Sequence, residues 1–120
     1  MLGVRRGADE TVDTILRHAR LGNHLVLGFT RLLFAHSFTD MLPFRAIALP
    51  SLLAIEMDDR NWGWTLQMQI RALRSGLRIA EADVTQRVRE GGVSKISGNL
   101  AVSLKVGAEM LYALARERLR

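Results

Sequence analysis

Apolar positions in the first third of the chain recur at helical spacing. The recurring residues are Leu21, Leu25, Phe29, Leu32 and Leu33. This spacing predicts an amphipathic helix that ends near His36 and whose polar face carries Arg20, Asn23 and Arg31. Residues 1–11 show no such stripe and mix two glycines with several charges, so we expect a flexible leader without secondary structure there.

The middle of the chain predicts short elements that are punctuated by proline. Pro43 prevents a helix over residues 37–45, and the apolar run 46–49 then has the composition of a strand. Pro50 suits the first turn of a short helix, which we expect to continue to Met57.

The next segment predicts a buried helix over residues 62–75. Asp59 or Asn61 is well placed to cap its N-terminus, because short polar side chains accept hydrogen bonds from the free N–H groups of a first turn. Apolar side chains occupy most of its circumference, so it should be largely buried. Gly76 has the position of a glycine that ends a helix.

The last third predicts a strand, a loop and a long helix. Residues 77–84 alternate between apolar and polar, as in a half-buried strand, and residues 85–98 form a polar, basic loop. A helix over 99–118 closes the chain, and its basic end suits the negative end of the helix dipole. Two short strands among many helices give an α/β chain whose strand edges lack partners. We therefore expect a missing N-terminal part of a parent enzyme, or self-association, to complete the sheet.

Composition adds a preference for anionic partners. The 120 residues suffice for one domain, and the formal net charge of +5 arises from 17 Lys and Arg against 12 Asp and Glu. Most of the bases are arginine, whose planar guanidinium matches phosphate oxygens. The chain contains no cysteine, which excludes disulfides, thiolate metal sites and cysteine nucleophiles. No secretory signal or spanning apolar run is evident, so we expect a cytoplasmic location that includes the inner face of the membrane.

The basic loop is the most informative segment for chemistry. Its Arg87, Arg89 and Lys95 flank glycines that let backbone N–H groups approach an anion closely, as a phosphate or diphosphate requires. A solvated surface loop has the same composition, and the loop by itself leaves that alternative open.

Three segments in a fixed order resemble a known family. They are residues 38–47 (FTDMLPFRAI), residues 62–69 (WGWTLQMQ) and residues 89–98, which include the run SKISG. In order and spacing they resemble the C-terminal half of family-2 glycosyltransferases of the dolichyl-phosphate mannosyltransferase kind, over about residues 17–108. The resemblance implies a GT-A fold, an α/β sandwich with a Rossmann-like nucleotide half. The chain would be its helix-rich C-terminal portion, a partial domain over residues 12–120 that lacks the nucleotide-binding half.

The resemblance also implies roles for individual residues. Arg20, Arg89 and Lys95 match positions that help to hold the phosphates of the nucleotide sugar. Arg45 matches the family's Phe-Arg pair, for which a structural ion pair is an equal alternative. With their neighbours, the implied substrate-binding residues are Arg20, Arg45, Arg87, Arg89, Ser94 and Lys95.

Asp40 and Gln67 complete the implied catalytic set. Asp40 matches the family aspartate near sugar and acceptor, where a carboxylate orients the attacking group or acts as a base, and a turn or capping role is its alternative. Gln67 stands where relatives normally carry glutamate, and an amide can form hydrogen bonds but cannot accept a proton as a base. Leu42 replaces a family glycine, which adds bulk to the turn.

The expected metal and partners follow from the same resemblance. A complete enzyme would need a divalent metal, Mg or Mn, at an Asp-x-Asp motif that this chain lacks. Asp58 and Asp59 are adjacent at a helix start and read as capping residues instead. The expected partners are a nucleotide sugar, a lipid-phosphate acceptor, a peripheral membrane contact, and either a separate N-terminal half or a second copy.

Two function classes remain open on the sequence. The first is transfer of a sugar from a nucleotide donor to a polyprenyl-phosphate or similar acceptor, by a chain that is incomplete alone. The second is a non-catalytic basic module that binds an anionic membrane surface or nucleic acid, with its last helix on the lipid. Under the first class no nucleic acid is expected as a partner.

Overall fold

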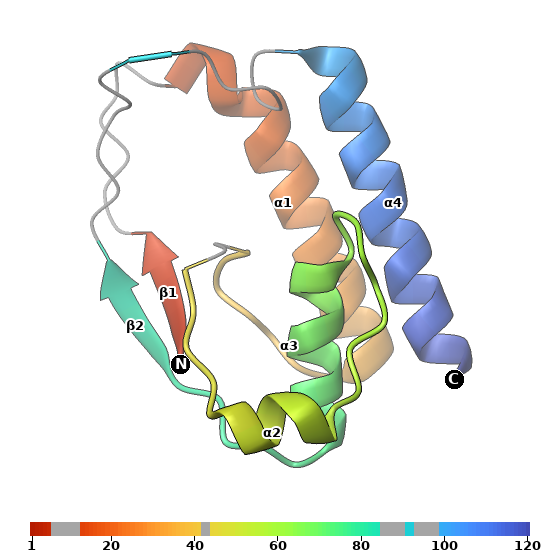
Figure 1. Ribbon diagram of the computed structural model, residues 1–120. Coiled ribbons are helices and arrows are strands. Elements are labelled where there is room, and N and C mark those ends of the chain that lie inside the picture. Colours follow the sequence, from red (N-terminus) through yellow and green to blue (C-terminus); the bar gives the residue numbers. More distant parts are fainter. Residues whose placement is uncertain (6–12, 42–43, 85–90, 93–98) are drawn as a thin grey trace.

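The computed structural model describes residues 1–5, 13–41, 44–84, 91–92 and 99–120 (Figure 1). These residues form a small α/β domain with four helices and two strands. In chain order the elements are β1 (Leu2–Arg5), α1 (Asp13–Phe34), α2 (Leu49–Ala54), α3 (Trp64–Arg74), β2 (Glu81–Val84) and α4 (Leu100–Leu119). None of the helices within these ranges is long and apolar enough to cross a membrane.

The two strands are parallel neighbours although they lie far apart in the sequence. Leu2 is in register with Glu81, and the Leu2 N–H donates to the carbonyl of Ala80 at 2.7 Å. The prediction of an unstructured leader is therefore wrong for Leu2–Arg5, because β2 supplies the hydrogen bonds that no local pattern reveals. Residues 6–12 of that leader lie outside the described residues.

The other edge of β1 is covered by residues 44–46. The Gly3 N–H donates to the Phe44 carbonyl at 2.9 Å, and the Ala46 N–H donates to the Met1 carbonyl at 3.0 Å. The strand predicted over 46–49 does not form, since α2 already begins at Leu49 with Pro50 in its first turn. The contact with β1 lies two residues earlier than expected.

Helices α1 and α4 run side by side, and α3 packs against α4 between them and the sheet (Figure 1). The buried core where they meet consists of Val26, Met41, Leu66, Ile70 and Leu114. Helix α3 buries six consecutive or near-consecutive side chains, which confirms the prediction of a largely buried helix.

Helix α1 is longer than predicted and turns a different face to the core. It begins at Asp13, and it buries Val26 and Thr30. Most of the apolar stripe that the spacing predicted is exposed: Leu21, Leu25, Phe29 and Leu32. The spacing identified the helix correctly, but a helix with apolar residues on two faces does not reveal which one α4 and the core will cover.

Local signals at helix ends are largely confirmed. Gly76 ends α3 at a φ of +69°, and the N–H of Leu77 donates to the Ala72 carbonyl at 3.0 Å, as in a Schellman motif. The predicted side-chain cap of α3 is wrong, because Gly63 occupies that position and makes no such bond. The Asp59 carboxylate instead accepts from the N–H of Asn61 at 2.8 Å.

Candidate functional site

Asp40 lies in an irregular segment between α1 and the sheet. Its neighbours Phe38 and Met41 are both buried, and they anchor the segment on the core from either side. Asp40 itself is only 6% exposed. A carboxylate at such a position must be held by hydrogen bonds, because an uncompensated buried charge is costly.

Part of that hydrogen bonding comes from the next residue and from α1. One carboxylate oxygen of Asp40 accepts from the Met41 N–H at 2.7 Å. The same oxygen lies 3.4 Å from the side-chain amide nitrogen of Asn23. The orientation of the carboxylate is therefore tied both to the local backbone and to a helix that lies 17 residues earlier in the chain.

The residue before Asp40 is fixed to the sheet. The Thr39 N–H donates to one carboxylate oxygen of Glu81 at 2.9 Å, and the Thr39 hydroxyl donates to the other at 2.6 Å. Glu81 is the first residue of β2. Glu81 could not be identified from the sequence, because nothing in the local pattern links two residues that are 42 positions apart.

Arg20 lies on α1, the helix that contacts this carboxylate through Asn23. It is exposed and lies three residues before Asn23, a spacing that makes two side chains neighbours on a helix surface. Asn23, one helical turn from Arg20, lies 3.4 Å from the Asp40 carboxylate, and a shared site for Arg20 and Asp40 stays a prediction. The Arg20 carbonyl also lies 2.8 Å from Nδ1 of His24.

Arg45 makes a contact within the protein. Its guanidinium donates to the carbonyl of Thr65 at 2.8 Å, in the first turn of α3. Burial lowers the pKa of Arg45, because the charged form loses part of its hydration. The contact gives Arg45 a structural role through a backbone carbonyl; the ion pair of the alternative interpretation and the role in substrate binding both stay predictions.

Gln67 uses its whole hydrogen-bonding capacity inside the protein. Its side-chain oxygen accepts from the N–H groups of Asp58 and Asp59 at 3.1 and 3.0 Å. Its nitrogen donates to the carboxylates of Asp58 and Glu117 at 2.5 and 2.8 Å. A carboxamide has two donors and two principal acceptor sites, so a contact with substrate would displace one of these bonds. A catalytic role for Gln67 stays a prediction.

The Gln67 partners belong to an ionic cluster that joins α3 to the end of α4. Glu117 is 1% exposed and accepts from the Arg71 guanidinium at 3.1 and 3.0 Å. Burial raises the pKa of Glu117, but the hydrogen bonds from Arg71 and Gln67 outweigh it and leave the pKa below its usual value. Hydrogen bonds from Arg120 and Gln67 lower the pKa of the half-exposed Asp58 to about 2.

Most of the basic loop that the sequence predicts lies outside the described residues. Its predicted residues Arg87, Arg89, Ser94 and Lys95 lie outside the described ranges. The residues that are described do not fit a divalent metal, since no group of three or more His, Asp or Glu side chains comes together among them.

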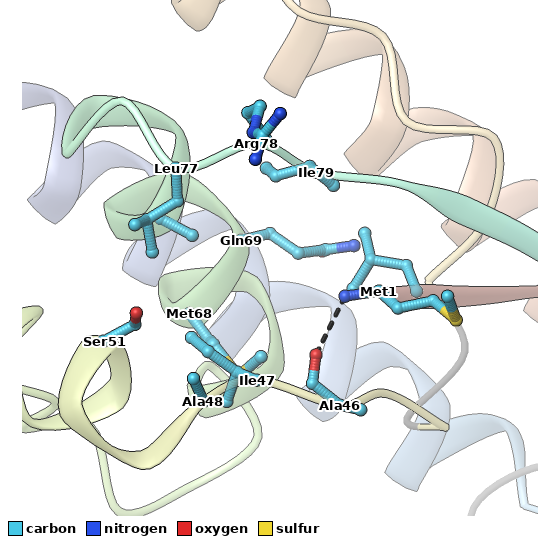
Figure 2. Close-up of a pocket in the computed structure, with 12 residues that line it drawn as sticks. Met1, Ala46, Ile47, Ala48, Ser51, Met68, Gln69, Leu77, Arg78 and Ile79 are labelled. Carbon is cyan, nitrogen blue, oxygen red and sulfur yellow. Dashed lines mark hydrogen bonds between the residues drawn. The ribbon is translucent and has the colours of Figure 1, made fainter.

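A cavity of about 300 Å³ lies beside α3, at the end of the sheet where β1 begins (Figure 2). Its walls include Ile47, Met68 and Leu77, and Figure 2 shows Gln69 reaching from α3 toward Met1. The Gln69 carboxamide belongs to a residue that is 2% exposed, and neither of its polar atoms has a hydrogen-bond partner among the described residues. Sequence analysis gave this glutamine no role.

Comparison with known proteins finds glycosyltransferases. The chain is 38% identical over 65 residues to an uncharacterized glycosyltransferase of Mycobacterium tuberculosis and to one of Mycobacterium bovis, which covers 54% of this chain and 30% of the relative. It is 33% identical over 76 residues to an undecaprenyl-phosphate mannosyltransferase of Micrococcus luteus, which covers 60% of this chain and 31% of the relative. The match thus spans about a third of the length of these relatives. No protein-family model matches the chain. No solved structure matches it either.

Proposed function

We propose that this chain forms part of a family-2-like glycosyltransferase with a GT-A fold. In this proposal it contributes to the transfer of a sugar from a nucleotide donor to a polyprenyl-phosphate or similar lipid-phosphate acceptor. The similarity to glycosyltransferases supports the reaction class, and the name of the Micrococcus luteus relative supports a lipid-phosphate acceptor. Its location would be the cytoplasm or the inner face of the membrane.

The observation that carries the proposal is the buried carboxylate of Asp40, which is contacted by Asn23 of α1. Asn23 lies against the Asp40 carboxylate and is one helical turn from Arg20. A carboxylate beside a cation suits a reaction in which an acceptor group is oriented while negative charge develops on a departing diphosphate. We propose Asp40 as the catalytic residue, and Arg20 as one of the groups that stabilise the diphosphate.

The basic loop would supply the remaining phosphate contacts. Arg89 and Lys95 are the proposed ligands of the diphosphate, with Arg87 and Ser94 beside them. Guanidinium and ammonium groups form the strong, charge-assisted hydrogen bonds that phosphate oxygens require. A divalent metal would have to be held by groups other than the described residues, such as those of an N-terminal half supplied by another polypeptide or a longer form of the chain.

Binding of a nucleotide sugar tests the proposal without requiring turnover. In the presence of a polypeptide that supplies the N-terminal half, we expect calorimetric titration with GDP-mannose or UDP-glucose to detect binding, and Arg20→Ala to weaken it about tenfold, since a charge-assisted hydrogen bond contributes about 1.5 to 3 kcal/mol. Arg31→Ala removes an equally exposed arginine from the last turn of the same helix and should leave affinity unchanged. Equal losses for the two variants, or no binding by the unmodified chain together with the N-terminal half, would count against the proposal.

Transfer to undecaprenyl phosphate tests the role of Asp40. In the presence of a polypeptide that supplies the N-terminal half, Asp40→Asn should retain donor binding and reduce transfer by about a hundredfold or more, which is typical when a general base is removed. An Asn variant that transfers as fast as the unmodified chain would remove Asp40 from the mechanism.

A second candidate function has its own supporting observation. Helix α1 exposes the apolar side chains of Leu21, Leu25, Phe29 and Leu32. Arginines at positions 20 and 31 lie on the same helix, and apolar side chains flanked by cations are typical of a helix that lies on an anionic membrane. This is the non-catalytic alternative with α1 on the lipid, in place of the last helix that the sequence suggested, and it predicts membrane binding without any nucleotide sugar.

Binding to lipid vesicles distinguishes the membrane-binding alternative from glycosyl transfer. We expect sedimentation with vesicles that contain phosphatidylglycerol to be lost in Leu25→Ser and to fall steeply with salt. Leu119→Ser, at the exposed end of α4, is the matched control and should bind like the unmodified chain. Equal binding by all three proteins would exclude α1 as the membrane-contacting helix.

A further inference from the structure

We propose that Glu81 is the positioning residue of Asp40, an inference that rests on the proposed role of Asp40 in transfer. Glu81 does not reach the reacting centre in this proposal. It fixes the backbone of Thr39, and through it the rotamer of the adjacent carboxylate.

Both oxygens of the Glu81 carboxylate accept hydrogen bonds from one residue, Thr39. The carboxylate receives the N–H of Thr39 at 2.9 Å and the hydroxyl of Thr39 at 2.6 Å. Hydrogen bonds to a charged acceptor are about twice as strong as neutral ones, and two bonds to one residue fix its orientation as well as its distance. The segment at Thr39 belongs to no helix or strand, so this pair of bonds replaces the support that regular structure would give.

Glu81 is in turn fixed by the sheet. It lies in register with Leu2 of β1, and the preceding carbonyl, that of Ala80, accepts from the Leu2 N–H at 2.7 Å. The sheet therefore fixes the position of Thr39 through Glu81. The side chain of Asp40 is instead held against α1 by Asn23, at 3.4 Å. Asp40 lies at the junction of the two, and removal of either tether removes one of the contacts that fix its orientation.

The Met41 amide reports on the carboxylate of Asp40 directly. Its N–H donates to the Asp40 side chain at 2.7 Å, and no hydrogen bond joins Met41 to Glu81 among the described residues. If Glu81 only stabilised the end of β2, its removal would leave the Met41 amide protected. If Glu81 positions Asp40, the Met41 amide should lose protection when Glu81 is removed.

Amide hydrogen exchange followed by NMR makes this measurement on the chain alone. We expect Glu81→Ala to accelerate exchange at Met41 by about fivefold or more, because one net hydrogen bond contributes about 1 kcal/mol. Glu81→Gln should restore protection, since its amide can accept from the Thr39 N–H and donate to the Thr39 hydroxyl. Asp83→Ala removes a carboxylate two residues further along β2 and should leave Met41 unchanged.

Thr39 provides a second pair of variants if Glu81→Ala does not fold. Thr39→Val keeps the branched shape without the hydroxyl and should accelerate exchange at Met41, whereas Thr39→Ser should not. Unchanged exchange at Met41 in both Glu81→Ala and Thr39→Val would overturn the proposal. Exchange in Glu81→Gln as fast as in Glu81→Ala would also overturn it.

Failure of the proposed function and failure of the Glu81 proposal would give different experimental results. If the unmodified chain together with the N-terminal half binds no nucleotide sugar, the transferase proposal fails, yet the exchange rates still decide whether Glu81 positions Asp40. If the chain does bind GDP-mannose, Glu81→Ala should retain that affinity within about twofold, because a positioning residue makes no contact with the donor. A tenfold loss of affinity would identify Glu81 as a binding residue and contradict the assignment.

Discussion

Two buried glutamines on α3 show how hydrogen bonding decides the effect of a buried amide on protein stability. Gln67 is 0% exposed, and its carboxamide makes four hydrogen bonds. Gln69 is 2% exposed, and its carboxamide makes none among the described residues. A buried polar group is costly only when it is unpaired, so the two residues should respond in opposite ways to the same replacement.

We expect Gln67→Met to destabilise the protein by about 3 kcal/mol, since it leaves the Glu117 carboxylate and two backbone N–H groups with fewer partners. Gln69→Met should be neutral or should stabilise by about 1 kcal/mol, because it replaces an unpaired amide with an apolar side chain of similar volume. Urea unfolding of both variants measures the difference. Similar losses of stability would show that the Gln69 amide is also satisfied in solution.

The same bonds explain why an amide suits position 67. Its nitrogen faces the carboxylates of Asp58 and Glu117. A glutamate, which the resembling family normally carries there, would place a third carboxylate against these two in a buried site. The two neighbouring carboxylates therefore favour glutamine at position 67 over the glutamate that the resembled family normally carries there.

At the scale of elements, the contact between the start of α3 and α4 depends on one glycine. A Cβ added to Gly63 would lie 2.7 Å from the Cβ of Ala113 and 2.6 Å from the Asp59 carboxylate. The Ala113 atom cannot move without shifting α4, because Ala113 is buried within that helix. Close approach of two backbones therefore requires glycine here, although its backbone angles are ordinary.

We expect Gly63→Ala to lower stability by about 1 to 3 kcal/mol, which is typical of overpacking. Gly107→Ala is the matched control within α4, since an added Cβ there meets nothing within 4 Å. Removal of glycine from a helix interior should raise stability by about 0.5 to 1 kcal/mol. Thermal unfolding of both variants measures the two shifts, and a stabilised Gly63→Ala would show that α3 and α4 are less tightly packed than this contact implies.

At the scale of the whole molecule, local signals predicted the elements and failed to predict their partners. The stop at Gly76, the start of α4 at Asn99 and the burial of α3 each follow from a few neighbouring residues. The pairing of β1 with β2 joins residues that are far apart, as do the bonds from Glu81 to Thr39 and from Gln67 to Glu117. Such contacts depend on the final packing, which no window of sequence contains.

In the candidate site, too, some residues could be predicted from the sequence and others could not. The resemblance pointed to Asp40 and Arg20; Asn23 lies against the first and one helical turn from the second, and their common site stays a prediction. The resemblance could not identify Glu81, whose role depends on a contact across the fold, and its residues in the basic loop remain predictions.

The ionic cluster at the end of α4 should make the stability of the whole domain sensitive to acid. Asp58 has a pKa of about 2 in the folded protein against an ordinary value of 3.8, and the pKa of Glu117 is also lowered. A carboxyl group whose pKa is lower in the folded state stabilises the fold above its unfolded pKa. That contribution is lost as the pH falls through the folded value.

We therefore expect the unfolding temperature to be steady near neutral pH and to fall as the pH drops from about 5 toward 2. Glu117→Gln removes the buried member of the cluster and should lower the unfolding temperature at pH 7, where the Arg71 guanidinium loses its charged partner. The gap between this variant and the unmodified protein should shrink as the pH falls, because protonation removes the same charge from the unmodified protein. A gap that stays constant from pH 7 to pH 2.5 would mean that Glu117 stabilises the fold by packing, and not by its charge.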